Sequence, residues 1–270
     1  MVHVAVIRGE DRRKTVRKAV DDLGAPLWKA CKDSSYLFIK PDLEGAGSLF
    51  FEDLSGLLDV LRLYSNAPIV IGDAPTFGAR DFFRASAYRA LDEKYRDLHL
   101  IDLTLDETVE SRFTRDEGGE IIVRRAKTAA EAPFSISLTG WRAHPDIGIS
   151  PSTLNWALGT WLVPPRETST GRSWNRGSWL GALTPAERSR LVAELFITRP
   201  CHAGVISGML SGDTVIASLD PLSADTLALT LMGMDAHSSA HLEHIASGGR
   251  WTNEIADLDV TPMMLQELMS

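Results

Sequence analysis

The sequence has little cysteine. Only Cys31 and Cys201 occur among its 270 residues, and they lie far apart along the chain. Two cysteines exclude a framework of several disulfides, and so low a content is typical of proteins of the reducing cytoplasm. They also exclude a four-thiolate iron–sulfur or zinc site built from this chain alone. We therefore expect a cytoplasmic protein that carries no iron–sulfur cluster.

Long apolar runs and runs of basic residues are also missing from the sequence. No segment approaches the roughly 20 apolar residues that a membrane-spanning helix requires. Residues 1–14 begin with a strand pattern, whereas a secretory signal combines a charged leader with an apolar run. The formal net charge is −8, and binding to a phosphate backbone requires a concentrated basic face. We therefore expect neither a membrane nor a nucleic acid as a partner.

The motifs of several large enzyme classes are absent. The sequence contains no GxGxxG, GxxxxGK[ST], GxSxG or HExxH element, so nucleotide-binding, acyl-transfer and zinc-protease functions lack their usual support. Hydrophobic residues make up 44% of the chain and charged residues 24%, which is typical of a globular protein. We expect one domain over residues 1–270.

Apolar strand patterns alternate with amphipathic helix patterns along the chain. This alternation predicts an α/β fold with a largely parallel or mixed sheet and helices on both faces. Residues 106–125 fit a β-hairpin that turns at residues 117–119, where two glycines suit a tight turn. The other predicted strands are residues 2–7, the strand in residues 36–43, and residues 69–71, 99–103, 134–138 and 215–217. The predicted helices are residues 11–23, 48–64, 81–95 and 224–232.

Charged side chains follow three of the predicted strands. Lys40 lies in YLFIKPDL, Asp73 in PIVIGDAP, and Asp220 and Asp225 in TVIASLDPLSAD. The carboxyl ends of parallel strands form the usual ligand crevice of an open α/β sheet, so we expect Lys40, Asp73 and Asp220 to converge. The alternative is that these residues are only turn and cap residues, for which Asp and Pro are favoured.

Lysine and carboxylate side chains at such an edge suit acid/base chemistry. A lysine that is desolvated beside other charges can act as a base or a nucleophile. We therefore take Lys40 and Asp73, supported by Asp220 and His144, as candidate catalytic residues. Pairing of Lys40 with Asp73 in a structural role is the alternative.

Tryptophan and arginine are concentrated in residues 139–179, which contain five of the seven tryptophans. Glycine, serine, threonine and proline between them predict a loop-rich insertion. We expect either a lid that binds an anionic substrate through arginines and indoles or an interface between copies of the chain. The candidate substrate-binding residues are Trp141, Arg142, Asn155 and Arg166 from this segment, together with Asp225.

Three histidines follow the late strand. His237, His241 and His244 have the spacing of one helix face, and two histidines four residues apart can bind a divalent metal. The alternative is a polar helix face without a metal. If a metal is bound, Asp220, Asp225 or His144 would complete its ligands.

Five segments of the sequence resemble the family known as domain of unknown function 362. They are VAVIRGEDRRKTVRKAV, FIKPDL, IVIGDAP with FFRASAYRAL, RRAKTAAEAPFSISLTG, and IASLDPLSADTLALTLMGMD, and they occur in the family's order over most of the chain. The resemblance implies a single α/β domain, which in relatives often accompanies a ferredoxin-like iron–sulfur module.

Two positions depart from the pattern of that family. Relatives carry a PKxKTH-like pattern where this chain reads TGWRAHPD, so the resemblance aligns His144 with the histidine and Arg142 with one lysine. A lysine–asparagine pair of the relatives is replaced here by Ala157 and Leu158, with Asn155 the nearest polar residue. No cysteine-rich module is present in this sequence either.

Together these features predict an enzyme that acts on a small polar or anionic molecule by general acid/base chemistry at the strand ends. Two alternatives stay open. One is a ligand-binding or cofactor-binding accessory protein without catalysis, and the other is a metal-dependent enzyme that uses the histidines.

Overall fold

The computed structural model describes residues 1–43, 50–76, 79, 83, 86–141, 143–144, 148–149, 152–168, 171–173, 175–209 and 214–260. Its centre is an eight-stranded sheet with the strand order β15-β1-β14-β13-β7-β2-β3-β4. The strands are β1 (Val2–Arg8), β2 (Leu37–Pro41), β3 (Ile69–Asp73), β4 (Leu98–Asp102), β7 (Phe134–Gly140), β13 (Ala203–Met209), β14 (Thr214–Ser218) and β15 (Leu258–Val260).

Neighbouring strands of this sheet are parallel except where β14 takes part. β14 runs antiparallel to both β1 and β13, while the pairs from β13 through β7, β2 and β3 to β4 are all parallel. Parallel strands need crossover helices, and the chain supplies them between successive strands. The predicted α/β fold with a largely parallel sheet is confirmed.

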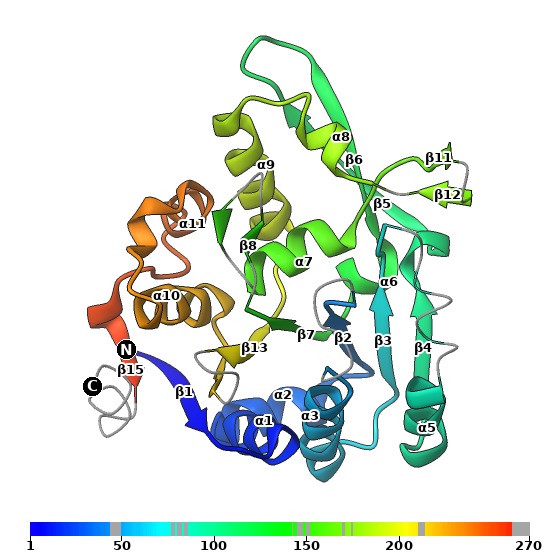
Figure 1. Ribbon diagram of the computed structural model, residues 1–270, viewed down its shortest axis with the longest axis vertical. Coiled ribbons are helices and arrows are strands. Elements are labelled where there is room, and N and C mark those ends of the chain that lie inside the picture. The colour runs from blue at the N-terminus through cyan, green and yellow to red at the C-terminus, as the bar shows by residue number, and fades with distance from the viewer. Residues whose placement is uncertain are drawn as a thin grey trace.

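Helices cover both faces of the sheet (Figure 1). Strand residues alternate between the faces: Leu37 and Ile39 of β2 pack into one buried cluster, and Phe38 packs into the other. The first face carries α1 (Arg12–Asp21), α2 (Gly24–Asp33), α3 (Phe50–Tyr64) and α5 (Ser86–Lys94). The second carries α7 (Ser152–Thr160) and α10 (Pro221–Leu231), with α9 (Pro185–Thr198) and α11 (Ala240–Ala246) packed behind them.

A small second sheet projects from the second face, at the top of Figure 1. It consists of β5 (Thr108–Thr114), β6 (Glu120–Ala126) and the short β10 (Trp161–Leu162) in the order β10-β6-β5. The predicted hairpin is confirmed, since β5 and β6 pair antiparallel. Gly118 and Gly119 have φ angles of 86° and 91°, which residues with a side chain adopt rarely.

Residues 139–179 are more regular than their composition predicts. They contain α7, the paired short strands β8 (Ala143–His144) and β9 (Gly148–Ile149), the pair β11 (Arg166–Thr168) and β12 (Gly171–Ser173), and the one-turn helix α8 (Gly177–Leu180). α7 belongs to the core, because Trp156 is 1% exposed and packs edge-on against Phe38 of β2. This part of the segment is therefore not a lid. None of the helices among the described residues is both long and apolar enough to cross a membrane.

The close approach of α1 to α3 depends on Gly56. A Cβ atom at Gly56 would lie 2.3 Å from the Arg13 carbonyl oxygen and 3.1 Å from the Val16 Cβ. We expect Gly56→Ala to separate the two helices and to lower the free energy of unfolding by about 2 kcal/mol, in the range typical of overpacking. Urea unfolding measures the change. Gly248→Ala is the control, because its nearest neighbour would be the Ile245 carbonyl oxygen at 3.4 Å, and an equal loss in both variants would contradict the packing argument.

Candidate functional site

Lys40 and Asp73 form a buried ion pair at the carboxyl ends of β2 and β3. The Lys40 Nζ lies 2.6 Å from the Asp73 Oδ1, and the two residues are 2% and 3% exposed. They meet because β2 and β3 are parallel neighbours that end at the same edge of the sheet. The sequence predicted this pair, and the structure brings it together.

Asn155 joins the pair from above the sheet. It lies on α7, and its Oδ1 accepts a hydrogen bond of 2.9 Å from the Lys40 Nζ. Its Nδ2 donates to the Ser137 Oγ at 2.9 Å and to the Lys40 carbonyl oxygen at 3.3 Å. The Lys40 ammonium also donates to the Pro41 carbonyl oxygen, so its three N–H donors have three acceptors. Asn155 therefore holds Lys40 in place.

Burial raises the pKa of the Asp73 carboxyl, and the Lys40 ammonium and the Leu43 N–H oppose that rise. The Leu43 N–H donates to the Asp73 Oδ2 at 2.9 Å and the Ala74 N–H to the Oδ1 at 2.7 Å. Asp42 is also buried, at 7% exposed, and its charge adds to the rise in the pKa of Asp73. Burial and the Asp42 charge thus favour the protonated form of Asp73 more than in an exposed aspartate.

Gly159 leaves the space that the Lys40 side chain fills. A Cβ atom at this position of α7 would lie 2.0 Å from the Lys40 Cε and 2.4 Å from its Nζ. Gly159 was not among the predicted site residues, although a glycine inside an apolar helix pattern often has a packing reason.

We expect Gly159→Ala to push the ammonium away from Asp73 and to lower the free energy of unfolding by about 2 kcal/mol. Urea unfolding of Gly159→Ala in the wild-type and Lys40→Ala backgrounds tests the cause. Since Lys40→Ala empties the space, Gly159→Ala should cost little there. An equal cost in both backgrounds would show that Gly159 acts through another neighbour.

Asp220 does not join the pair, and its predicted convergence with Lys40 and Asp73 is wrong. Because β14 is antiparallel to β13, its carboxyl end lies at the opposite edge of the sheet. There the Asp220 Oδ1 accepts hydrogen bonds from the Leu222 and Ser223 N–H groups at 3.0 and 3.2 Å and caps α10. Burial raises the pKa of Asp220. Asp220 is therefore a cap residue, the alternative given above.

Asp225 anchors α7. The residue is fully buried. Its Oδ1 accepts from the Ser152 N–H at 2.8 Å, and its Oδ2 accepts from the Thr153 N–H at 2.9 Å and the Thr153 Oγ1 at 2.7 Å. These donors belong to the first turn of α7, where a carboxylate also meets the positive end of the helix dipole.

The three histidines do not share one helix. His237 lies in the short 3-10 helix η2 (Ala236–Ser238), whereas His241 and His244 lie in α11. His237 is exposed, and its Nδ1 lies 2.5 Å from the Glu243 Oε1, which raises the pKa of His237. His241 is buried and meets the Ser239 Oγ. In the described part of the chain, no group of three His, Cys, Asp or Glu side chains is arranged to hold a metal.

Other predicted site residues can be placed only in part. Trp141 follows β7 at the carboxyl edge of the sheet, and its backbone N–H donates to the Ser207 carbonyl oxygen at 3.3 Å. Arg142 lies outside the described residues. His144 and Arg166 lie in β8 and β11, and their side chains lie outside the described part of the structure.

Two further groups at this edge were missed by the sequence analysis. Arg12 forms an ion pair with the fully buried Asp53, whose Oδ2 also accepts from the Ser207 Oγ at 2.6 Å. Arg176 donates to the Ala74 carbonyl oxygen at 2.7 Å and to the Trp161 carbonyl oxygen at 2.8 Å. These contacts join segments far apart in the sequence, and no local pattern predicts them.

Comparisons with known proteins add little to this geometry. No protein-family model matches the sequence, and a search of curated proteins found no match. The fold is similar to that of the lactate racemase apoprotein from Thermoanaerobacterium thermosaccharolyticum, with 15% identity over 90% of this chain and a TM-score of 0.48. It is also similar to a structural-genomics protein from Thermotoga maritima, with 10% identity over 74% of this chain and a TM-score of 0.44.

The chain spans only about half the length of these two structures, 56% of the first and 52% of the second. These similarities are compatible with an α/β family, and the resemblance to domain of unknown function 362 stays a prediction.

Proposed function

We propose that this chain is an enzyme that acts on a small polar or anionic molecule, with Lys40 and Asp73 as its proton-transfer pair. The observation that carries the proposal is the buried contact of 2.6 Å between the Lys40 Nζ and the Asp73 Oδ1. It lies at the carboxyl edge of a parallel sheet, the usual ligand crevice of such folds. The segments that resemble domain of unknown function 362 support the same place, since FIKPDL contains Lys40 and IVIGDAP contains Asp73.

The proposed chemistry is a proton relay. Asp73 takes a proton from the Lys40 ammonium, which leaves a neutral amine that removes a proton from the substrate. Asn155 orients the Lys40 Nζ through its hydrogen bond of 2.9 Å. The pair is enclosed, at 2% and 3% exposed, so this chemistry requires the edge of the sheet to open when a substrate binds.

Burial also supports a catalytic role for the pair over an ordinary surface ion pair. Ionisable groups with a pKa shifted by burial and a specific charged partner are frequent at active sites, and burial raises the pKa of Asp73.

A ligand-binding accessory protein is the second candidate, favoured by the complete set of acceptors around Lys40. The proposal includes a single domain over residues 1–270 and a small-molecule partner.

A screen of small carboxylates and phosphate esters tests the proposal. Thermal unfolding reports binding, and proton NMR in D2O reports conversion or exchange of substrate protons. The variants are Lys40→Met and Asp73→Asn. Lys127→Met is the matched control, because Lys127 pairs with Glu107 at 2.8 Å on the surface.

We expect a compound that the wild type and Lys127→Met convert and that folded Lys40→Met and Asp73→Asn leave unchanged. Conversion by Lys40→Met at the wild-type rate would refute the role of the pair. Compounds that bind without being converted would instead support the accessory protein, and stoichiometric metal by elemental analysis would support the metal-dependent alternative.

A further inference from the structure

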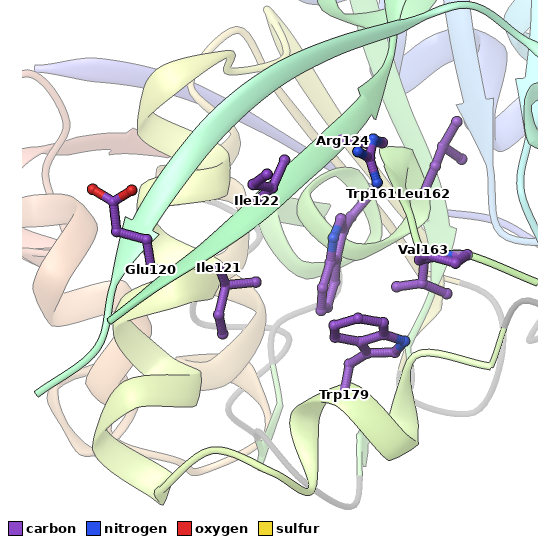
Figure 2. A pocket seen from close by; sticks show the side chains of 9 residues that line it. Glu120, Ile121, Ile122, Arg124, Trp161, Leu162, Val163 and Trp179 are labelled. Carbon is purple, nitrogen blue, oxygen red and sulfur yellow. The ribbon is translucent and has the colours of Figure 1, made fainter. Parts of the chain in front are cut away.

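An apolar pocket of about 320 Å³ lies beside the small sheet, away from the Lys40–Asp73 pair. Figure 2 shows the side chains of Trp161, Trp179 and Val163 gathered beneath the ribbon of β6, with Ile121 pointing toward the same side. The walls of the pocket include Glu120, Ile122, Arg124, Trp161, Pro164 and Trp179. A volume of this size is at the lower end of the range for small-molecule sites.

The pocket exists because β10 leaves β6 early. β10 pairs with β6 only at Trp161 opposite Arg125 and Leu162 opposite Arg124. Continuing that register would place Pro164 opposite Ile122, and proline has no N–H with which to extend the ladder. The sequence LVPPR therefore ends β10 and leaves the neighbouring stretch of β6 without a strand beside it.

Ile122 presents its backbone N–H and C=O toward this opening. The Arg115 N–H donates to the Gly119 carbonyl oxygen and the Lys127 N–H to the Glu107 carbonyl oxygen. In an antiparallel ladder every second pair is bonded, so the bonded pairs include residue 121 and residue 123 of β6. The backbone groups of Glu120 and Ile122 point the other way, and within the described residues no hydrogen bond to them from a neighbouring strand is present.

The open edge is too short for another strand. It offers only Glu120 and Ile122, whereas strands in sheets are about five or six residues long. Along this open edge the Glu120 C=O, an acceptor, lies next to the Ile122 N–H, a donor. A planar ring whose edge carries a donor next to an acceptor can form hydrogen bonds with both of these backbone groups. The same ring can stack on an indole such as that of Trp179.

We propose that this pocket binds a planar heteroaromatic molecule whose edge carries adjacent hydrogen-bond donor and acceptor atoms. The ring stacks on Trp179, its acceptor accepts a hydrogen bond from the Ile122 N–H, and its donor gives a hydrogen bond to the Glu120 C=O. Arg124, half-buried at the pocket and paired with Glu110 at 2.8 Å, borders the site. This inference does not rest on the proposed function.

Isothermal titration calorimetry with adenine and purine tests the proposal. Adenine has an amino donor next to a ring acceptor, and purine has the same ring system without the amino group. We expect adenine to bind with a stoichiometry of one and purine to bind about fivefold more weakly, as the loss of one hydrogen bond predicts. Equal affinities, or no binding of adenine, would overturn the proposal without any variant being needed.

Two variants locate the binding site. Trp179→Ala should weaken adenine binding about tenfold through the loss of stacking, whereas Trp28→Ala, which removes an exposed tryptophan stacked on Tyr64, should leave it unchanged. Ile122→Pro should weaken it about fivefold, and Ile122→Val, which keeps the N–H, should not. Ile122→Pro removes no bond of the ladder with β5, because that N–H points outward. Unchanged affinity for adenine in both Trp179→Ala and Ile122→Pro would show that adenine binds elsewhere and would refute the assignment. Binding of an extended peptide at this pocket instead of adenine would refute it as well.

Discussion

Lys40→Met is expected to lower the free energy of unfolding by about 3 to 5 kcal/mol, the range for breaking a buried ion pair by removing one partner. The substitution keeps the length of the side chain but leaves the Asp73 carboxylate buried without its cation. Asp73 then keeps only the N–H groups of Leu43 and Ala74 as donors among the contacts described above. Urea unfolding followed by circular dichroism measures the loss.

A double-mutant cycle separates the pair from its surroundings. Asp73→Asn should also destabilise the protein, and the double variant should lose clearly less than the sum of the two single losses, because neither buried charge is then left alone. Lys127→Met with Glu107→Gln is the control, since that pair is exposed and exposed pairs couple weakly. Additive losses at Lys40 and Asp73 would contradict a direct interaction.

The loss in Lys40→Met should also depend on pH. Burial raises the pKa of Asp73, and the Lys40 ammonium lowers it. Removing Lys40 removes this opposing effect, so the pKa of Asp73 rises further in the variant. The folded variant then binds a proton more tightly than the unfolded chain, so its stability falls as the pH rises from the ordinary aspartate pKa of about 4 to the raised one. The difference from wild type should therefore shrink as the pH falls from about 8 toward 4. A constant difference would assign the loss to packing alone.

Asp225→Ala is expected to cost about 4 kcal/mol, because it leaves the Ser152 and Thr153 N–H groups without their acceptor in the core, at about 1 to 3 kcal/mol for each unsatisfied group. The carboxylate is fully buried and accepts three hydrogen bonds from these two residues. Asp225→Asn keeps one carbonyl acceptor and should lose less. Thermal and urea unfolding give both values.

The same substitution should loosen α7 and thereby Asn155, which holds Lys40. Amide hydrogen exchange of residues 153–160 should quicken more than exchange in α1, which lies on the other face of the sheet. Asp235→Ala is the control, since Asp235 accepts from the His237 N–H at an exposed short helix. If Asp225→Ala behaves like Asp235→Ala, Asp225 is not the anchor of α7.

Much of the fold could be predicted from periodicity alone. The predicted strands at residues 2–7, 69–71 and 134–138 match β1, β3 and β7, and the helix predicted at residues 48–64 matches α3 (Phe50–Tyr64). These segments pack an apolar face against the sheet, so their pattern carries the information. By contrast, α2 (Gly24–Asp33) was not predicted, because Gly24 and Pro26 in its first turn are residues typical of turns.

Lys40 and Asp73 were within reach of sequence reasoning, because each follows an apolar strand and parallel neighbours end at one edge. Asp220 also follows an apolar strand, but it lies at the opposite end of the sheet. Its strand is antiparallel to β13, and strand direction depends on how the whole sheet is connected, not on residues near Asp220.

Periodicity and strand-end residues are local properties, so the α/β class and the strands that carry Lys40 and Asp73 could be predicted from the sequence alone. By contrast, the packing of the folded chain brings Asn155 and Gly159 of α7 around Lys40, places Asp225 against the start of that helix, and puts Asp220 at the opposite end of the sheet. The contacts of α7 join residues more than 70 positions apart, and the place of Asp220 depends on the direction of β14 in the sheet. The local sequence pattern holds no information on either.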